Sequence, residues 1–177
     1  MEEPRLRGEA ADVTARDASR LKQFTSRGYD RGRNVVWQAA WVASLNLVFM
    51  KWWCPSAWRA SMLRAFGATV GQRVLIRHRV RVLWPWKLDI ADDVWIGEGV
   101  WLLNLEPISI AEDVCISQEA LVCTGSHHHR APDFAFDNAP IRIERGAWIG
   151  ARAIVLRGSV VPANTLVPAG GVFPARQ

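Results

Sequence analysis

Large apolar residues recur at every sixth position through the C-terminal half of the chain. In the clearest stretch these positions are Ile143, Ile149, Val155, Val161, Val167 and Phe173, and the residues four further on are small: Ala147, Ala153, Ser159, Thr165 and Gly171. A strand alternates with a period of two and a helix with a period of 3.6, so a sustained period of six fits neither alone. The pattern predicts a coil of short straight segments, each with one inward apolar residue and a small residue near the bend.

The same spacing occurs upstream, in three blocks. The apolar positions there are Val70, Ile76, Val82, Ile90, Ile96, Leu102, Ile110, Ile116 and Val122, and two-residue additions at Leu88-Asp89 and Ile108-Ser109 shift the phase between blocks. Three such segments would complete one turn, and turns would stack at the ordinary strand spacing of about 4.8 Å. Because a fully buried Val or Ile contributes about 1.5–3 kcal/mol, this column can stabilise a slender fold.

The six-residue pattern fails between Ser126 and Ile141. The intervening segment, 127–140, reads HHHRAPDFAFDNAP and contains three of the four histidines. A solenoid tolerates such an insertion as a loop on one face, and that face is often the binding face.

The N-terminal third predicts two further regions. Residues 1–28 are polar and charged and are expected to form a flexible tail. Residues 29–68 are rich in tryptophan and predict a helix over 35–53 and a second helix opened by Pro55, while residues 69–177 form the coil domain. In the second helix Leu63 suggests a packed face, and Arg59 and Arg64 suggest a wet or anionic face.

Three interpretations are open for the apolar segment 35–53. It could pack on the coil or on a neighbouring subunit, lie in the surface of a membrane, or span a membrane. Tryptophans, such as Trp52 and Trp53, are enriched at membrane interfaces. Four more tryptophans, Trp84, Trp86, Trp95 and Trp101, lie at outward positions of the coil, where they could form a subunit contact or a platform for a sugar.

Composition narrows the function classes. The chain has 177 residues, a net charge of +5 and three cysteines, Cys54, Cys115 and Cys123, without a paired spacing. This predicts one domain with an appendage in a reducing compartment. The N-terminal MEEPRLRGEA predicts no secretory signal. The sequence contains no zinc-finger, helix-turn-helix or aromatic RNA-binding signature, which argues against a nucleic-acid partner.

The stretch CISQEALVCTGSHHH (115–129) resembles the acetyltransferase branch of the hexapeptide-repeat proteins, and more narrowly the exopolysaccharide O-acetyltransferases of the colanic acid type. FGATVG (66–71), LWPWKLDI (83–90) and AWIGARA (147–153) match as well. The resemblance implies an all-β, left-handed parallel β-helix with an N-terminal helical appendage. It also implies a cytoplasmic homotrimer, with active sites between subunits, that transfers acetyl groups from acetyl-CoA to a sugar hydroxyl without a metal.

The resemblance places the general base at His127, which closes the T-G-S-H motif. A sugar hydroxyl is a poor nucleophile, and an imidazole with an ordinary pKa near 6.5 can take its proton during attack. His128 and His129 depart from the family pattern, so the choice among the three histidines stays open. No covalent acyl-enzyme is needed, and no nucleophilic Cys or Ser is assigned.

For acetyl-CoA the resemblance indicates the C-terminal coils. Trp148 would border the thioester arm, and Ala151, Ala169 and Gly170 would lie along it. Pro174-Ala175 replaces the family's Thr-Lys pair, so Arg176 or Arg152 would supply the phosphate contact. All these positions could equally be ordinary corners of the coil.

Two residues are candidates for binding the acceptor. Asn104, at a coil corner, could orient a sugar hydroxyl or only cap the corner. Phe134, like Phe136, could stack on a sugar ring or pack inside the loop.

Two alternative functions stay open: a scaffold without catalysis, and a metal enzyme like the γ-class carbonic anhydrases. The aromatic 35–53 segment suggests peripheral contact with the inner membrane face, where lipid-linked sugars lie.

Overall fold

The computed structural model describes residues 24–25, 29–128, 131 and 133–174. The chain divides into two compact units. The coil unit comprises residues 30–126 and 137–174 of the described chain. The histidine unit comprises residues 127–136 together with Phe24, Thr25 and Tyr29, again within the described residues.

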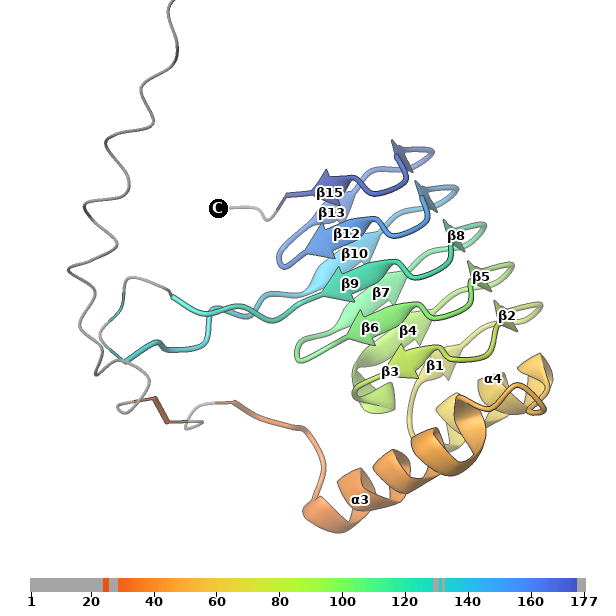
Figure 1. Cartoon of the computed structure of the whole chain (residues 1–177), viewed down its shortest axis with the longest axis horizontal. Coiled ribbons are helices and arrows are strands. Elements are labelled where there is room, and N and C mark those ends of the chain that lie inside the picture. The colour runs from red at the N-terminus through yellow and green to blue at the C-terminus, as the bar shows by residue number, and fades with distance from the viewer. Residues whose placement is uncertain (1–23, 26–28, 129–130, 132, 175–177) are drawn as a thin grey trace, which may run out of the picture. The chain divides into compact units, whose positions relative to one another are not determined.

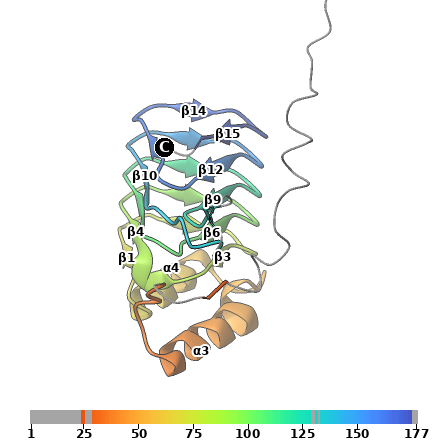
Figure 2. The same ribbon diagram turned by 90° about the vertical axis from the view of Figure 1, so that its left-hand side faces the viewer.

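The coil unit is a stack of short parallel strands (Figures 1 and 2). Its three five-stranded sheets are called A, B and C. Sheet A contains β1 (Thr69–Val70), β4 (Leu88–Ile90), β7 (Ile108–Ile110), β10 (Ile141–Ile143) and β13 (Val160–Val161). Sheet B contains β2 (Leu75–Ile76), β5 (Trp95–Ile96), β8 (Cys115–Ile116), β11 (Trp148–Ile149) and β14 (Leu166–Val167). Sheet C contains β3 (Arg81–Val82), β6 (Trp101–Leu103), β9 (Leu121–Cys123), β12 (Ile154–Leu156) and β15 (Val172–Phe173).

Each strand pairs with the strand three earlier in the chain, so the chain completes one turn of the coil every three strands. In sheet A, Val70 pairs with Ile90, Ile90 with Ile110, Ile110 with Ile143 and Ile143 with Val161. All five are buried. The expected all-β parallel β-helix with an N-terminal helical region is therefore confirmed, and the six-residue pattern identified its interior column.

Extra residues enter the coil at one corner, where the chain passes from sheet C to sheet A. Leu88-Asp89 and Ile108-Ser109, which the sequence marked as additions, are themselves parts of strands β4 and β7. The added length lies before them, in the 3₁₀ turn η2 (Pro85–Lys87) and at 104–107. The insertion 127–140 falls in the same corner one turn later. The interior column can therefore continue unbroken past all three insertions.

The first predicted helix is shorter than expected. The α-helix α3 (Val35–Ser44), capped by the Asn34 side chain, continues as a π-helical turn, η1 (Leu45–Phe49), and the helical run stops before Trp53. The backbone carbonyls at the end of this helical run accept hydrogen bonds from residues outside it. Phe49 O and Lys51 O accept from the guanidinium of Arg59, and Met50 O accepts from the backbone N–H of Arg79.

Arg59 corrects the prediction for the second helix, α4 (Ser56–Ala65). The sequence suggested a wet or anionic position, but the residue is only 4% exposed. Its guanidinium also donates to Ile76 O in the coil, so three backbone carbonyls surround it. Burial lowers the pKa of this group, yet an arginine stays protonated. Arg59 thus connects the helices to the first turn.

The helix α3 packs on the coil, as the first of the three interpretations proposed. Trp41 is fully buried, its ring contacts Phe49 and Phe66, and its indole N–H donates to Val82 O at 3.0 Å. The opposite side of α3 and of the η1 turn that continues it has exposed apolar residues, among them Val36 and Leu47. No helix within the described residues is long and apolar enough to cross a membrane.

The outward tryptophans are less exposed than expected. Trp84 is buried and stacks on Trp86 with ring centroids 5.0 Å apart, and Trp86 donates to Arg31 O. Gly32 allows this contact, because a Cβ there would lie 3.0 Å from the indole nitrogen of Trp86. Trp95, in contrast, stays half-exposed.

We expect the interior column to dominate stability. Ile116→Ala should lower the free energy of unfolding by about 2–5 kcal/mol, because it opens a cavity between turns that cannot collapse. Leu166→Ala is the matched control: it lies in the same sheet but points outward, and it should change stability by less than about 0.5 kcal/mol. Denaturant unfolding monitored by circular dichroism measures both. An equal loss of unfolding free energy in the two variants would contradict a dominant contribution of the interior column to stability.

Candidate active site

The corner between sheets B and C is regular through all five turns. We call it the B–C corner. Its residue pairs are His78-Arg79, Glu98-Gly99, Gln118-Glu119, Ala151-Arg152 and Ala169-Gly170. Each turn is tied to the previous one by a backbone hydrogen bond, such as Gly170 N to Ala151 O at 2.8 Å. Ala151, Ala169 and Gly170, three of the predicted cofactor residues, therefore lie on adjacent turns of one ridge.

Small residues on this ridge have a structural reason. A Cβ on Gly150 would lie 2.6 Å from Ala169 N, so the stacked turns themselves exclude a side chain there. Gly170 has a φ of 68°, which favours glycine. The same absence of side chains leaves the backbone of the ridge open to an extended ligand.

Trp148 precedes this corner on the outward face of sheet B. It is 53% exposed, and its indole N–H donates to Ser117 Oγ at 2.8 Å. That bond fixes the ring against the turn below. In the same outward column lie Leu75, Trp95, Cys115 and Leu166.

Arg152, one of the two candidates for a phosphate contact, is engaged by a carboxylate. Its Nε lies 2.6 Å from Glu119 Oε2, and this hydrogen bond lowers the pKa of Glu119. The other candidate, Arg176, lies outside the described residues, as does His129.

Cys115 lies between Trp95 and Trp148 in the outward column, where a thiolate could have served as a nucleophile. Burial raises the pKa of this thiol, although a hydrogen bond with Ser117 partly offsets the effect. The thiol therefore stays protonated at neutral pH and is a weak nucleophile.

The histidine unit holds the imidazole of His127 between aromatic rings. The ring of Phe134 stacks on it with centroids 4.3 Å apart and planes 9° from parallel, and Phe136 lies at 4.9 Å. Phe24 meets it edge-on at 5.3 Å. The sequence offered packing of Phe134 and Phe136 inside the loop as an alternative, but it did not predict that His127 is their partner or that Phe24 takes part, because ring stacking within an irregular loop leaves no periodic signal.

One hydrogen bond fixes which nitrogen of His127 is basic. Nδ1 lies 2.8 Å from the carbonyl oxygen of Phe134, and a carbonyl only accepts. Nδ1 therefore carries the proton in the neutral ring, and Nε2 has the lone pair. Nε2 has no hydrogen-bond partner among the described residues. An imidazole held in one tautomer by its other nitrogen is well suited to accept a proton.

Neighbouring positions in this unit differ from His127. His128 is exposed, and its backbone N–H donates to Ala135 O. The ring of Phe134 packs within the loop, which was the alternative to stacking on a sugar; a contact with the acceptor stays a prediction. Within the part of the chain that the structure describes, no three His, Cys, Asp or Glu side chains gather as a metal site would require.

Asn104 is fully buried, and backbone groups use its whole amide. Its Oδ1 accepts from the N–H groups of Leu83 and Trp84, and its Nδ2 donates to the carbonyls of Trp84 and Lys87. These contacts are those of the corner-capping alternative. Orientation of a sugar hydroxyl by this side chain stays a prediction.

The known proteins that are similar to this chain include acetyltransferases. No family model matches the chain. The chain is 37% identical over 142 residues to WcaF of Escherichia coli K12, provisionally named a colanic acid biosynthesis acetyltransferase, and the match covers 78% of this chain and 77% of that protein. WcaF of Shigella flexneri gives the same values.

Solved structures share the fold. A maltose O-acetyltransferase from Clostridium difficile 630 superposes with a TM-score of 0.69 at 18% identity, over 79% of this chain and 77% of that one. The hexapeptide-repeat-containing acetyltransferase VCA0836 from Vibrio cholerae gives 0.59 at 26% identity, over 80% and 88%. VCA0836 has also been crystallised with acetyl-CoA, in a structure that gives 0.58 at 21% identity over 86% and 92%. With the identity to WcaF extending over three quarters of both chains, this chain belongs to the WcaF family of hexapeptide-repeat acetyltransferases.

Proposed function

We propose that this acetyltransferase transfers an acetyl group from acetyl-CoA to a sugar hydroxyl during polysaccharide or glycan biosynthesis. The observation that carries this proposal is the 37% identity to WcaF over 142 residues. The Clostridium difficile neighbour, a maltose O-acetyltransferase, acts on a saccharide, and VCA0836 binds acetyl-CoA. Both support the choice of acceptor and donor.

In the proposed reaction His127 is the general base. Nε2 takes the proton of the sugar hydroxyl as the hydroxyl oxygen attacks the thioester carbonyl. The tetrahedral intermediate then expels the CoA thiolate, and the imidazolium gives that proton to the thiolate. The carbonyl of Phe134 stabilises the imidazolium in between, since it accepts from Nδ1 at 2.8 Å. The stacked rings of Phe134 and Phe136 limit the orientations of the imidazole.

We assign acetyl-CoA to the ridge of the B–C corner. Trp148 would border the thioester arm, and the backbone at Ala151, Ala169 and Gly170 would hydrogen-bond to it. Arg152 would have to leave Glu119 to reach a phosphate, so Arg176 is the better candidate of the two.

The assembly that we propose is a homotrimer with active sites between subunits. The outward column of sheet C supports this, because it is apolar from Trp101 through Leu121 and Ile154 to Val172. The matching column of sheet A is polar from Asp89 through Ser109 to Arg142 and apolar only at its end, Val160. Sheet C is therefore better suited than sheet A to burial against another copy.

Replacement of the base tests the mechanism. His127→Gln should lower kcat by about 10²–10⁴-fold, because glutamine cannot take the proton, while acetyl-CoA binding stays intact. Thiol release with a panel of nucleotide sugars and lipid-linked sugar mimics measures the rate. His128→Gln is the control and should keep most of the activity; the reverse result would move the base to His128.

Two tryptophans of one column test the cofactor site. Trp148→Ala should weaken acetyl-CoA binding by about tenfold or more, because it removes a large apolar contact. Trp95→Ala is the control, because Trp95 lies two turns away in the same column and is 51% exposed, against 53% for Trp148. It should leave the Kd for acetyl-CoA unchanged. Calorimetric titration measures both, and equal effects would argue against a donor site at Trp148.

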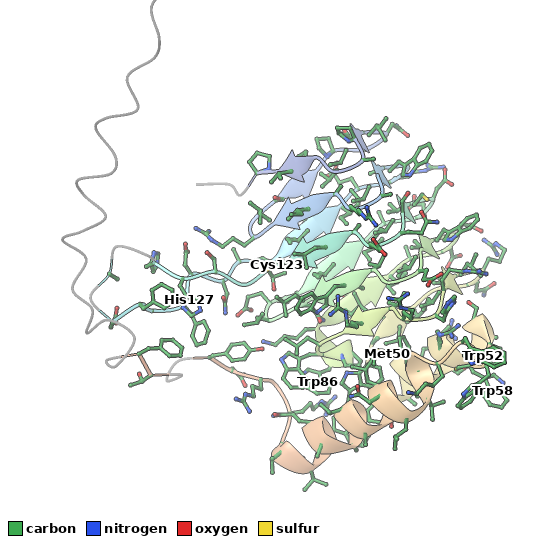
Figure 3. All side chains as sticks on the ribbon, in the orientation of Figure 1. Met50, Trp52, Trp58, Trp86, Cys123 and His127 are labelled. Carbon is green, nitrogen blue, oxygen red and sulfur yellow. The ribbon has the colours of Figure 1, made fainter. Side chains whose placement is uncertain are left out.

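We also propose that the helical region contacts a membrane surface. Trp52, Trp53 and Trp58 are 80%, 49% and 60% exposed, and Figure 3 shows Trp52 and Trp58 extending from the same end of the helical layer. Indole rings favour the membrane interface. The exposed side of α3 and η1, including Val36 and Leu47, adds apolar area beside them.

Vesicle sedimentation tests this contact. The wild-type protein should sediment with phospholipid vesicles, and the triple change Trp52→Ser, Trp53→Ser and Trp58→Ser should reduce the bound fraction at least tenfold, because each indole contributes to insertion. Trp95→Ser controls for the loss of an exposed tryptophan elsewhere. Absence of binding by the wild type would exclude peripheral association under those conditions.

A further inference from the structure

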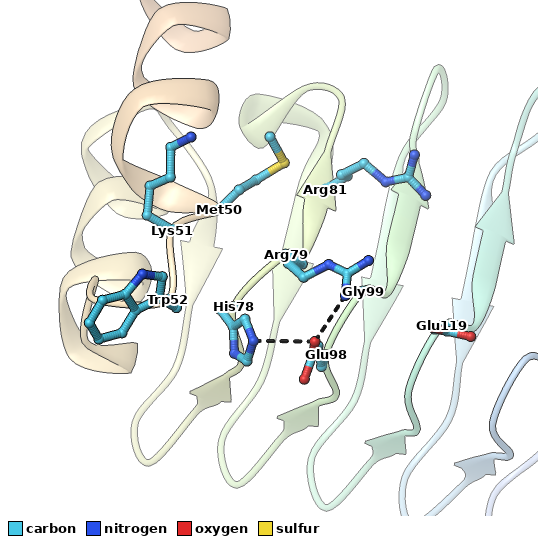
Figure 4. A pocket seen from close by; sticks show the side chains of 9 residues that line it. All are labelled: Met50, Lys51, Trp52, His78, Arg79, Arg81, Glu98, Gly99 and Glu119. Atoms are coloured by element: carbon cyan, nitrogen blue, oxygen red, sulfur yellow. Dashed lines mark hydrogen bonds and ion pairs between the residues drawn. The ribbon is translucent and has the colours of Figure 1, made fainter.

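A pocket of about 810 Å³ lies where the helices meet the first turns of the coil (Figure 4). Its walls come from two places: the connection between η1 and α4, and the B–C corner with the strand that follows it. The lining residues are Met50, Lys51, Trp52, His78, Arg79, Arg81, Glu98, Gly99 and Glu119.

The backbone around this pocket is held from both sides. The N–H of Arg79 donates to Met50 O at 2.9 Å, which ties the coil corner to the helical connection. The buried guanidinium of Arg59 donates to Lys51 O at 2.6 Å. A ligand would therefore meet groups whose main-chain positions are already fixed, which lowers the cost of binding.

The charges in the pocket do not cancel. Glu98 lies 3.2 Å from His78 Nε2 and 3.3 Å from Arg79 Nη1, as the dashed lines in Figure 4 show. Glu119 is engaged by Arg152. With both carboxylates paired, two cations of the pocket are left over.

These two cations are Lys51 and Arg81, and neither forms an ion pair with any described residue. The guanidinium of Arg81 lies over the ring of Trp101, 4.1 Å from its centroid. This stacking holds the plane of the group while its N–H edge can still bind an anion. Lys51 contributes a second positive charge from the opposite wall.

The pocket shares a ridge with the proposed donor site. His78-Arg79 and Ala151-Arg152 belong to the same B–C corner and are separated by three turns, or about 14 Å at the ordinary strand spacing. An acceptor could therefore have its anionic end in the pocket and its sugar nearer the thioester.

We propose that this pocket binds the diphosphate that links the acceptor saccharide to its carrier. The inference rests on the proposed function and names the substrate class, a glycosyl diphosphate. Lysine and arginine are the side chains suited to phosphate oxygens, and a diphosphate spans two cationic groups. The carrier can be a lipid or a nucleoside. Trp52 lines the pocket and is 80% exposed, which favours the lipid.

Direct binding tests the pocket without relying on catalysis. Inorganic pyrophosphate, titrated by calorimetry into the full chain, should bind, and Lys51→Ala or Arg81→Gln should each weaken binding by about tenfold or more. Arg142→Gln is the matched control, since it removes an exposed arginine that forms no ion pair with another described residue from the outer face of sheet A, and it should leave pyrophosphate binding unchanged. No binding by the wild type, or equal binding by all variants, overturns the proposal.

Turnover then separates this proposal from the proposed function. With a glycosyl diphosphate acceptor, Lys51→Ala and Arg81→Gln should raise KM at least tenfold and leave kcat nearly unchanged. With the same saccharide lacking the diphosphate they should match the wild type. If both variants keep the wild-type KM and kcat, the diphosphate site is wrong but the proposed acetyl transfer stands. If pyrophosphate binds but no acetyl transfer occurs with any acceptor, only the proposed acetyl transfer is wrong.

Two acceptor arms distinguish the carriers. One arm presents a sugar on a polyprenyl diphosphate in phospholipid vesicles, and the other presents the same sugar on a nucleoside diphosphate in solution. A lower KM for the first arm identifies the lipid as the carrier, and a lower KM for the second identifies the nucleoside. If a diphosphate gives no advantage in either arm, the assignment is wrong.

Discussion

Stacking of one inward residue on its equivalent in the next turn is the constraint on which the coil depends. The helices pack on the first turn, and the later turns depend on the interior column, so each inward position must stay in register with the turn below, as Ile90, Ile110 and Ile143 do. Extra chain is tolerated only where it leaves that column undisturbed. The three insertions meet this condition because all of them leave and rejoin the coil between sheets C and A.

This constraint gives the corners different roles. The insertion corner is irregular and needs polar caps, and for this reason Asn104 is buried with its amide fully used. Thr124 Oγ1 accepts from Glu106 N and donates to Leu103 O, both in the preceding turn. The B–C corner has no insertion, so its backbone forms a uniform ridge. A long, thin donor suits the uniform ridge, and a positioned histidine suits the insertion.

The sequence predicted the interior well because the column repeats with a fixed period and needs only apolar residues. It failed where a contact joins segments that share no period. The first helix was expected to reach Trp53, but Arg59 and Arg79 bind the carbonyls at its end. The partners of His127 escaped prediction for the same reason, since Phe24 and Phe134 are brought together only by the folded loop.

Arg59 shows how a buried charge can serve function at a distance. Its three carbonyl contacts hold the connection between η1 and α4, and that connection carries both Lys51 and Trp52. The side chain that faces the proposed diphosphate and the side chain that faces the proposed membrane thus lie next to each other on one fixed segment. A lipid-linked acceptor needs this adjacency, because its phosphate lies at the membrane surface while its sugar extends into water. In the proposed arrangement, the same buried guanidinium sets the distance between the membrane surface and the ridge that we assign to acetyl-CoA.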